Sequence, residues 1–202
     1  MKTKTWLLCI SLLSTSLLSA QVGIKGGLNL SSVASSAQEV DQQQMALGWQ
    51  AGLMARAEIN KTLSIQPELY FVQKGSEYEY LGALVTQKLQ YVELPLLLIL
   101  EPFGALLNLQ VGPQVSWLTG VETTYVNGPF GTSGTIHTNK EDYNQLDYGI
   151  SVGAGITLNQ LSIDVRLVQG FQNIEKDAVI GPVTISSNTR NYSVQASLGI
   201  FF

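Results

Sequence analysis

The sequence predicts an all-β protein, an eight-stranded antiparallel transmembrane up-and-down β-barrel. Three observations lead to this prediction: an apolar leader at the N-terminus, eight segments in which apolar and polar residues alternate, and connections that alternate between short and long. Alternation with a period of two is typical of a strand with one apolar and one polar face. Only 13% of the 202 residues are charged and 45% are hydrophobic. Because soluble domains carry about 25% charged residues, this composition argues against an ordinary soluble protein.

The first twenty residues are typical of a secretory signal peptide. Lys2 and Lys4 form a basic start, residues 6–18 are mostly apolar, and Ser19 and Ala20 are small. This order predicts cleavage after Ala20. An N-terminal membrane anchor is the alternative, but it needs about 20 apolar residues, and this stretch is shorter. We therefore expect a signal peptide over 1–20 and one barrel domain over 21–202.

Eight segments of the mature chain alternate between apolar and polar residues. They are 22–30, 47–58, 63–71, 89–100, 107–117, 147–158, 161–167 and 191–202. In the last of them, Tyr192, Val194 and every second residue to Phe202 are apolar or small, and the residues between are polar or glycine. The segment 89–100 is apolar on both faces near its end, so its phase rests on Glu93 facing the polar side. Its apolar run, 94–100, is too short for a membrane-spanning helix.

The connections between these segments alternate in length. Short links are expected near 60–61, 101–104 and 159–160, and long loops at about 32–44, 75–86, 119–144 and 175–189. Bacterial outer-membrane barrels have an even strand number, short periplasmic turns and long extracellular loops. A soluble sandwich or a lipocalin-like barrel would show the same alternation. The strand lengths, the aromatic residues towards strand ends and the leader favour the membrane barrel, and hence the cell outer membrane as its location.

All charges on the predicted strands fall on the polar face. An eight-stranded barrel has an interior just wide enough for its own side chains, and an unpaired charge there would cost several kcal/mol. The inward charges are therefore expected to pair with one another. The predicted lumen charge network contains Lys25, Arg56, Glu58, Glu68, Glu93, Asp164 and Arg166. It predicts a lumen filled by ion pairs and amides instead of an open pore.

Several short motifs resemble those of a known family. They are Gly23–Ser31, Gln66–Leu69 with Gln73–Gly75, Tyr91–Leu97, and Gly112-Pro113. In combination the sequence resembles the PorT-like outer-membrane β-barrel proteins of Bacteroidota over essentially the whole mature chain. The resemblance implies an outer-membrane location and an eight-stranded barrel, and one branch of that family assists the type IX secretion and gliding machinery. Because the motifs consist of strand residues, they indicate the architecture of the protein and say little about a role in that machinery.

The C-terminal residue is a candidate assembly signal. Phe202 ends the last alternating segment, and it is similar to the terminal aromatic residue by which the barrel assembly machinery recognises outer-membrane barrels. A second role, compatible with the first, is that of an interfacial aromatic anchor.

The sequence offers little chemistry. His137 is the only histidine and has no evident nucleophile and base beside it. Gly153-Ala154-Gly155 lacks the third glycine of a nucleotide fingerprint, and no His or Cys spacing indicates a metal site. We expect no catalytic residue, no cofactor and no metal. The net charge of −4 also argues against nucleic acid as a partner.

The long loops are the best candidates for contact with other molecules. Their acidic residues are Glu39, Asp41, Glu77, Glu79, Glu122, Glu141, Asp142, Glu175 and Asp177. These could hold divalent cations beside lipopolysaccharide or form a solvated acidic rim. The segment 119–139 is rich in Gly, Thr and Asn, as mobile loops are, and either contacts a partner or surface ligand or is passive.

Three function classes follow from the sequence. The first is a non-enzymatic barrel that contributes to envelope structure or presents its loops to a partner. The second is an accessory of a type IX-like secretion or gliding machinery, and the third is a lipid-modifying barrel enzyme. The expected partners are outer-membrane lipid and lipopolysaccharide, the barrel assembly machinery, and secretion or surface partners through the loops.

Overall fold

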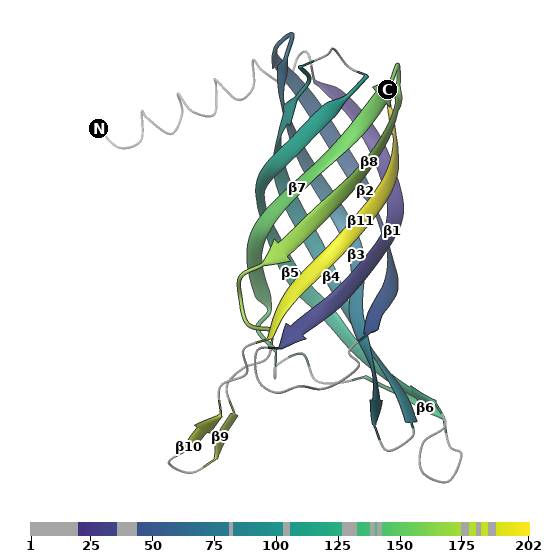
Figure 1. Ribbon diagram of the computed structural model, residues 1–202, viewed down its shortest axis with the longest axis vertical. Coiled ribbons are helices and arrows are strands. Elements are labelled where there is room, and N and C mark those ends of the chain that lie inside the picture. The colour runs from purple at the N-terminus through teal and green to yellow at the C-terminus, as the bar shows by residue number, and fades with distance from the viewer. Residues whose placement is uncertain are drawn as a thin grey trace.

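A computed structural model shows a closed β-barrel (Figure 1). It describes residues 20–35, 44–80, 83–102, 106–126, 133–137, 140, 143–174, 178–180, 183–185 and 189–202. The barrel strands are β1 (Gln21–Ser35), β2 (Gln44–Asn60), β3 (Leu63–Tyr80), β4 (Ala83–Leu100), β5 (Asn108–Val126), β7 (Leu146–Leu158), β8 (Leu161–Gly170) and β11 (Thr189–Phe201). The predicted signal peptide lies outside the described residues, apart from Ala20.

Every barrel strand pairs antiparallel with two neighbours. The order runs β4-β3-β2-β1-β11-β8-β7-β5, and pairing of β4 with β5 closes the ring. The predicted eight-stranded barrel is therefore confirmed. Three shorter strands lie outside the ring: β6 (Gly134–His137), which pairs with β5, and the hairpin of β9 (Ala178–Ile180) with β10 (Val183–Ile185).

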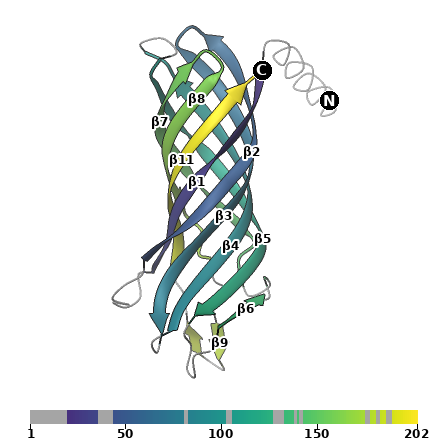
Figure 2. The same cartoon turned by 90° about the vertical axis from the view of Figure 1, so that its right-hand side faces the viewer.

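The short connections and the C-terminus lie at one end of the barrel (Figure 2). The β2–β3 turn is held by Asn60, whose Oδ1 accepts hydrogen bonds from the backbone N–H groups of Thr62 and Leu63 at 2.9 and 3.0 Å. In the β7–β8 turn, Asn159 has a φ of 54°, a left-handed conformation that asparagine tolerates better than most residues. We call this end of the barrel the turn end and the opposite end the loop end.

The predicted long loop 75–86 is mostly strand, and the predicted long loop 119–144 is strand in part. The segment 75–86 belongs to a regular hairpin in which Gly75 pairs with Lys88 and Tyr80 with Ala83. Within the segment 119–144, β5 continues to Val126 and β6 pairs with it. These strands are longer than predicted, because β-branched and aromatic residues continue along 121–126 and pair with β4. The strands therefore extend past the barrel at the loop end (Figure 1).

The two faces of the barrel wall have the burial expected of a membrane barrel. Apolar side chains on the outer face are exposed, while polar and charged side chains on the inner face are buried. On β5, for example, buried and exposed residues alternate from Asn108 to Thr119. Glu93 is fully buried, so the predicted phase of β4 is confirmed. Among the described residues, no helix is long and apolar enough to cross a membrane.

Glycine allows close contact between neighbouring strands inside the barrel. A Cβ atom on Gly112 of β5 would lie 2.0 Å from the backbone oxygen of Leu96 on β4. Real side chains do not approach backbone this closely. Substitution of Gly112 by any other residue would therefore require the wall between β4 and β5 to move.

Candidate functional site

The centre of the barrel interior holds four buried charges. Lys25 from β1 and Arg166 from β8 face Glu68 from β3 and Asp164 from β8. Lys25 Nζ lies 2.5 Å from Asp164 Oδ2 and 3.4 Å from Glu68 Oε1. Arg166 binds Glu68 with both terminal nitrogens; its Nη2 donates to Oε1 at 2.8 Å, and its Nη1 donates to Oε2. We call these four residues the central cluster; its formal charges sum to zero.

Two glutamine side chains complete the central cluster. Gln66 Nε2 donates to Glu68 Oε1 at 2.5 Å, and Arg166 Nε donates to Gln110 Oε1 at 2.6 Å. Strands β3 and β8 are four places apart in either direction around the ring, so the pair of Glu68 and Arg166 spans the barrel diameter. A protein interior tolerates buried charges when they are paired and hydrogen-bonded, as these are.

A second group of polar contacts lies towards the turn end. Arg56 of β2 donates from Nε to Gln66 Oε1 at 2.7 Å and from Nη1 to Glu101 Oε1 at 3.1 Å. The same Nη1 reaches Thr157 Oγ1 on β7 at 3.4 Å, and β2 and β7 are also diametrically opposite. The guanidinium carbon lies 4.8 Å from the centre of the Phe201 ring.

A third group lies towards the loop end. Lys74 Nζ is 2.6 Å from Glu93 Oε1, which also accepts a hydrogen bond from Ser116 at 3.1 Å. Asn191 of β11 donates to Asp147 Oδ2 at 3.1 Å and to the Tyr91 hydroxyl at 3.3 Å. Strands β11 and β4 face each other across the ring. The contact of Asn191 with Tyr91 is therefore the third contact that spans the barrel diameter.

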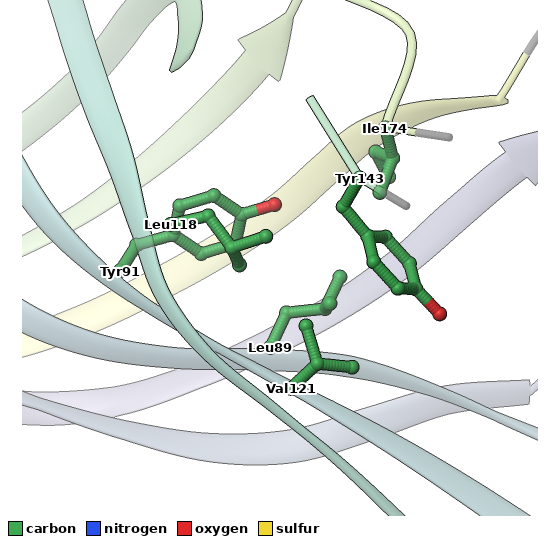
Figure 3. Packing of buried hydrophobic residues seen from close by; sticks show 6 residues of the cluster. All are labelled: Leu89, Tyr91, Leu118, Val121, Tyr143 and Ile174. Carbon is green, nitrogen blue, oxygen red and sulfur yellow. The ribbon is translucent and has the colours of Figure 1, made fainter. Parts of the chain in front are cut away.

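Beyond this third group, apolar side chains fill the interior at the loop end (Figure 3). This apolar cluster consists of Leu89, Tyr91, Leu118, Val121, Tyr143 and Ile174. Four of them come from β4 and β5, while Tyr143 and Ile174 come from the connections after β6 and β8. Those two connections are joined where Asn144 N–H donates to the Ile174 carbonyl oxygen at 2.8 Å. The connections thus place apolar side chains inside the strand ring.

Six of the seven residues predicted for the lumen charge network are buried inside the barrel. Four of them form the central cluster, Arg56 joins it through Gln66, and Glu93 pairs with Lys74 in a separate group. Glu58 is the exception: it is exposed at the turn end of β2, and no ion pair in the described part of the chain includes it. Glu58 has the same inward phase as Arg56, but β2 reaches the rim of the barrel there. Alternation shows which face of the strand a residue occupies, but not how far along the barrel axis it lies.

Three charged residues of the interior were missing from the predicted network. Lys74 lies beyond the predicted end of its strand, Glu101 falls in a segment predicted to be a short link, and Asp147 falls on the predicted polar face but outside the predicted network. The alternation of β3 could have found Lys74, because it continues the phase of Gln66 and Glu68. The sequence contains no comparable signal for the inward packing of Tyr143 and Ile174.

The two C-terminal phenylalanines have different environments. Phe201 is 2% exposed and packs under Arg56, whereas Phe202 is 74% exposed. The backbone N–H of Phe202 donates to the Val22 carbonyl oxygen at 2.8 Å. The candidate assembly signal therefore presents its ring on the outside of the barrel, while its neighbour belongs to the interior.

This difference gives a clean test of the assembly signal. Deletion of Phe201 and Phe202 should lower the amount of protein in the outer membrane, but it also removes the contact with Arg56. Phe202→Ala leaves that contact in place and should still lower the outer-membrane level several-fold, as measured by quantitative blotting of membrane fractions. Unchanged insertion of Phe202→Ala would refute the assembly role.

The described residues place only some of the candidates for catalysis or metal binding. His137 is the last residue of β6 and lies opposite Glu122 in the strand register. Among the described residues, no group of three or more His, Cys, Asp or Glu side chains is placed to hold a metal ion. Glu39, Asp41, Glu141, Asp142, Glu175 and Asp177 lie outside those residues.

Comparisons with known proteins support the architecture. The sequence matches the family model described as outer membrane protein beta-barrel domain over residues 14–176. No curated relative matches it. Among solved structures, Neisserial surface protein A is similar, with 12% identity, a TM-score of 0.55 and coverage of 91% of this chain and 99% of that one. The attachment invasion locus protein Ail of Yersinia pestis, in complex with the heparin analogue sucrose octasulfate, has 13% identity, a TM-score of 0.50 and the same coverage.

At these identities the similarity to solved structures shows the fold alone. The family match covers most of the chain, and it agrees with a closed eight-stranded ring whose outer face is apolar. The chain therefore belongs to the outer membrane protein β-barrel domain family and is located in the outer membrane.

Proposed function

We propose that this protein is a non-enzymatic outer-membrane barrel whose lumen is closed by its own side chains and which presents its loop end to a partner. The observation that carries the proposal is the set of contacts that cross the barrel diameter at three levels. They join Arg56 to Thr157, Glu68 to Arg166, and Tyr91 to Asn191. The apolar cluster adds a further obstruction at the loop end.

The proposal predicts that the barrel does not conduct like a porin. Ions would have to displace paired charges and pass apolar side chains, and each charge left without a partner costs several kcal/mol. In planar lipid bilayers the purified protein should therefore give no steady single-channel steps of porin size. Large, steady steps would contradict a closed lumen.

The extension of the strands beyond the barrel supports a presenting role. Residues 76–80 of β3, 83–88 of β4, 121–126 of β5 and β6 form one continuous antiparallel sheet at the loop end. We call these residues the outer sheet. A paired sheet holds its position better than a single loop, and rigid surfaces bind partners with a smaller loss of entropy.

The chemistry of the loop end favours a protein partner over a polyanion. The structure of Ail holds a heparin analogue, which is strongly anionic. In this chain the loop segments carry the nine acidic residues given above and only two basic ones, Lys140 and Lys176, with Lys88 and Arg190 just beyond their ends. This acidic excess opposes binding of sulfated glycan.

Co-purification tests the presenting role directly. The tagged protein should retain a partner in a detergent extract, and a variant in which residues 77–86 are replaced by a Gly-Ser linker should lose it while remaining in the outer membrane. If the retained proteins are secretion components, the accessory role implied by the resemblance to PorT-like barrels is the one supported. Equal retention by both proteins would contradict a role for the outer sheet.

A deletion strain tests the non-enzymatic part of the proposal. Its lipid profile should match that of the parent strain, because the proposal assigns no lipid chemistry to the barrel. The deletion strain could instead lack a lipid modification that the parent gene restores and the His137→Ala gene does not. That result would contradict the proposal and support the barrel enzyme.

A further inference from the structure

A pocket of about 380 Å³ lies at the loop end of β7, outside the barrel interior. Its volume falls in the range of about 300–1,000 Å³ that is usual for small-ligand sites. The lining residues are Tyr143, Asn144, Gln145, Leu146, Tyr148 and Gln172. Three of them carry side-chain amides, two carry phenol rings and none is charged.

The pocket lies at the edge of the apolar outer face. Leu146 and Tyr148 are the first outward-facing residues of β7 and are both exposed. The Tyr148 ring packs edge-on against Phe171, with ring centres 6.4 Å apart, and Trp117 lies opposite Leu146 in the strand register. Aromatic residues at strand ends mark the level of the lipid headgroups in outer-membrane barrels. The side of the pocket nearer the middle of the barrel therefore contacts lipid hydrocarbon, and the side nearer the loops contacts lipid headgroups.

Two amides in this pocket have unused hydrogen-bonding capacity. In the described part of the chain, the side chains of Gln145 and Gln172 have no hydrogen-bond partner, although both are partly buried. Each amide can donate two hydrogen bonds and accept two. They are thus available to a ligand with several hydroxyl groups.

The backbone that carries these amides is fixed. Leu118 N–H donates to the Gln145 carbonyl oxygen at 2.7 Å, and Gln172 N–H donates to Asp147 Oδ1 at 3.2 Å. Tyr143 is anchored in the apolar cluster (Figure 3) and accepts a hydrogen bond from Gln87 at 2.7 Å. A pocket whose walls are already ordered loses little entropy when it binds a ligand.

We propose that this pocket binds the uncharged sugar ring of a glycolipid in the outer leaflet. The amides of Gln145 and Gln172 hydrogen-bond the sugar hydroxyls, the exposed ring of Tyr148 packs against the C–H face of the sugar, and the acyl chains follow Leu146 into the bilayer. A phosphate headgroup fits less well, because none of the described residues that line the pocket is a Lys or Arg that could pair with it. The inference goes beyond the proposed function, since it concerns the lipid side of the barrel and needs neither a closed lumen nor a protein partner.

Trp117 provides the readout for a binding experiment. The protein, with Trp49→Phe and freed of residues 1–20, retains Trp117 as its single tryptophan, beside the pocket. It is placed in phosphatidylcholine nanodiscs that contain increasing amounts of monoglucosyl diacylglycerol, and the fluorescence is recorded. The expected result is a saturable change in fluorescence. In the double variant Gln145→Ala/Gln172→Ala the half-maximal change should need a glycolipid mole fraction at least about tenfold higher, because two hydrogen bonds are lost.

Matched controls distinguish the source of the ligand. Gln160→Ala removes an exposed amide at the turn end and should leave the titration unchanged. Phosphatidylglycerol should produce no saturable change, and free methyl glucoside should bind at least about tenfold more weakly than the anchored sugar, because it lacks the acyl chains that bury apolar surface. A linear response to the glycolipid, an unchanged double variant, or equal binding of free methyl glucoside would each overturn the proposal.

Discussion

Replacement of Glu68 by glutamine should lower the free energy of unfolding by about 3–5 kcal/mol, the usual cost of breaking a buried ion pair from one side. Glu68 is 3% exposed and, like Asp164, forms ion pairs with both Lys25 and Arg166. The substitution leaves two cations facing Asp164 alone, so the central cluster acquires a buried positive charge. Urea titration of the protein refolded in detergent micelles, followed by tryptophan fluorescence, measures this change.

Two further variants separate the charge effect from a general loss of packing. Glu58→Gln removes an exposed carboxylate and should change the unfolding free energy by less than about 0.5 kcal/mol. Glu68→Gln combined with Lys25→Met returns the central cluster to zero net charge and should recover part of the lost stability. A Glu68→Gln protein as stable as the Glu58→Gln protein would contradict the role given to the central cluster.

Arginine in the middle of the outer face should be the second large effect. Val165 lies halfway along the outward row of β8 that starts at Leu161, and 53% of its surface is exposed. If hydrocarbon surrounds this row, Val165→Arg should cost about 2–4 kcal/mol, the range found for arginine at the bilayer midplane. The same urea titration, performed in lipid vesicles, gives the value.

Leu161→Arg is the matched control for depth. Leu161 is also exposed, at 40%, but it lies beside the β7–β8 turn. Near the interface the cost of arginine falls to about 0–1 kcal/mol. A flat profile, in which Val165→Arg and Leu161→Arg cost the same, would argue against a bilayer around β8.

The alternation of the strands was sufficient to predict the barrel and the direction of its side chains. A period of two assigns each residue to one face without knowledge of the partners, so Lys25, Glu68 and Arg166 could be placed inside from the sequence. Which of them meet could not be predicted, because contacts across the ring depend on strand tilt and stagger. The pair of Glu68 and Arg166 lies 98 positions apart in the chain.

Strand ends and loops were predicted less well. The strands β3, β4 and β5 continue past the barrel because they pair with one another there. Such pairing is only weakly reflected in the amino-acid composition of these segments. Tyr143 and Ile174 enter the apolar cluster from connections without periodicity, so only their tertiary contacts place them inside. For the same reason the pocket beside Tyr148 could not be predicted from the sequence.

The most direct test of the account is the state of the purified protein without any surfactant. Residues 21–202, refolded in detergent, should sediment as a single folded species in the analytical ultracentrifuge. The same protein should aggregate once the detergent is removed, because its outer face is a continuous apolar surface. A folded barrel that stays dissolved and monodisperse in plain buffer would contradict the claim that hydrocarbon surrounds that face.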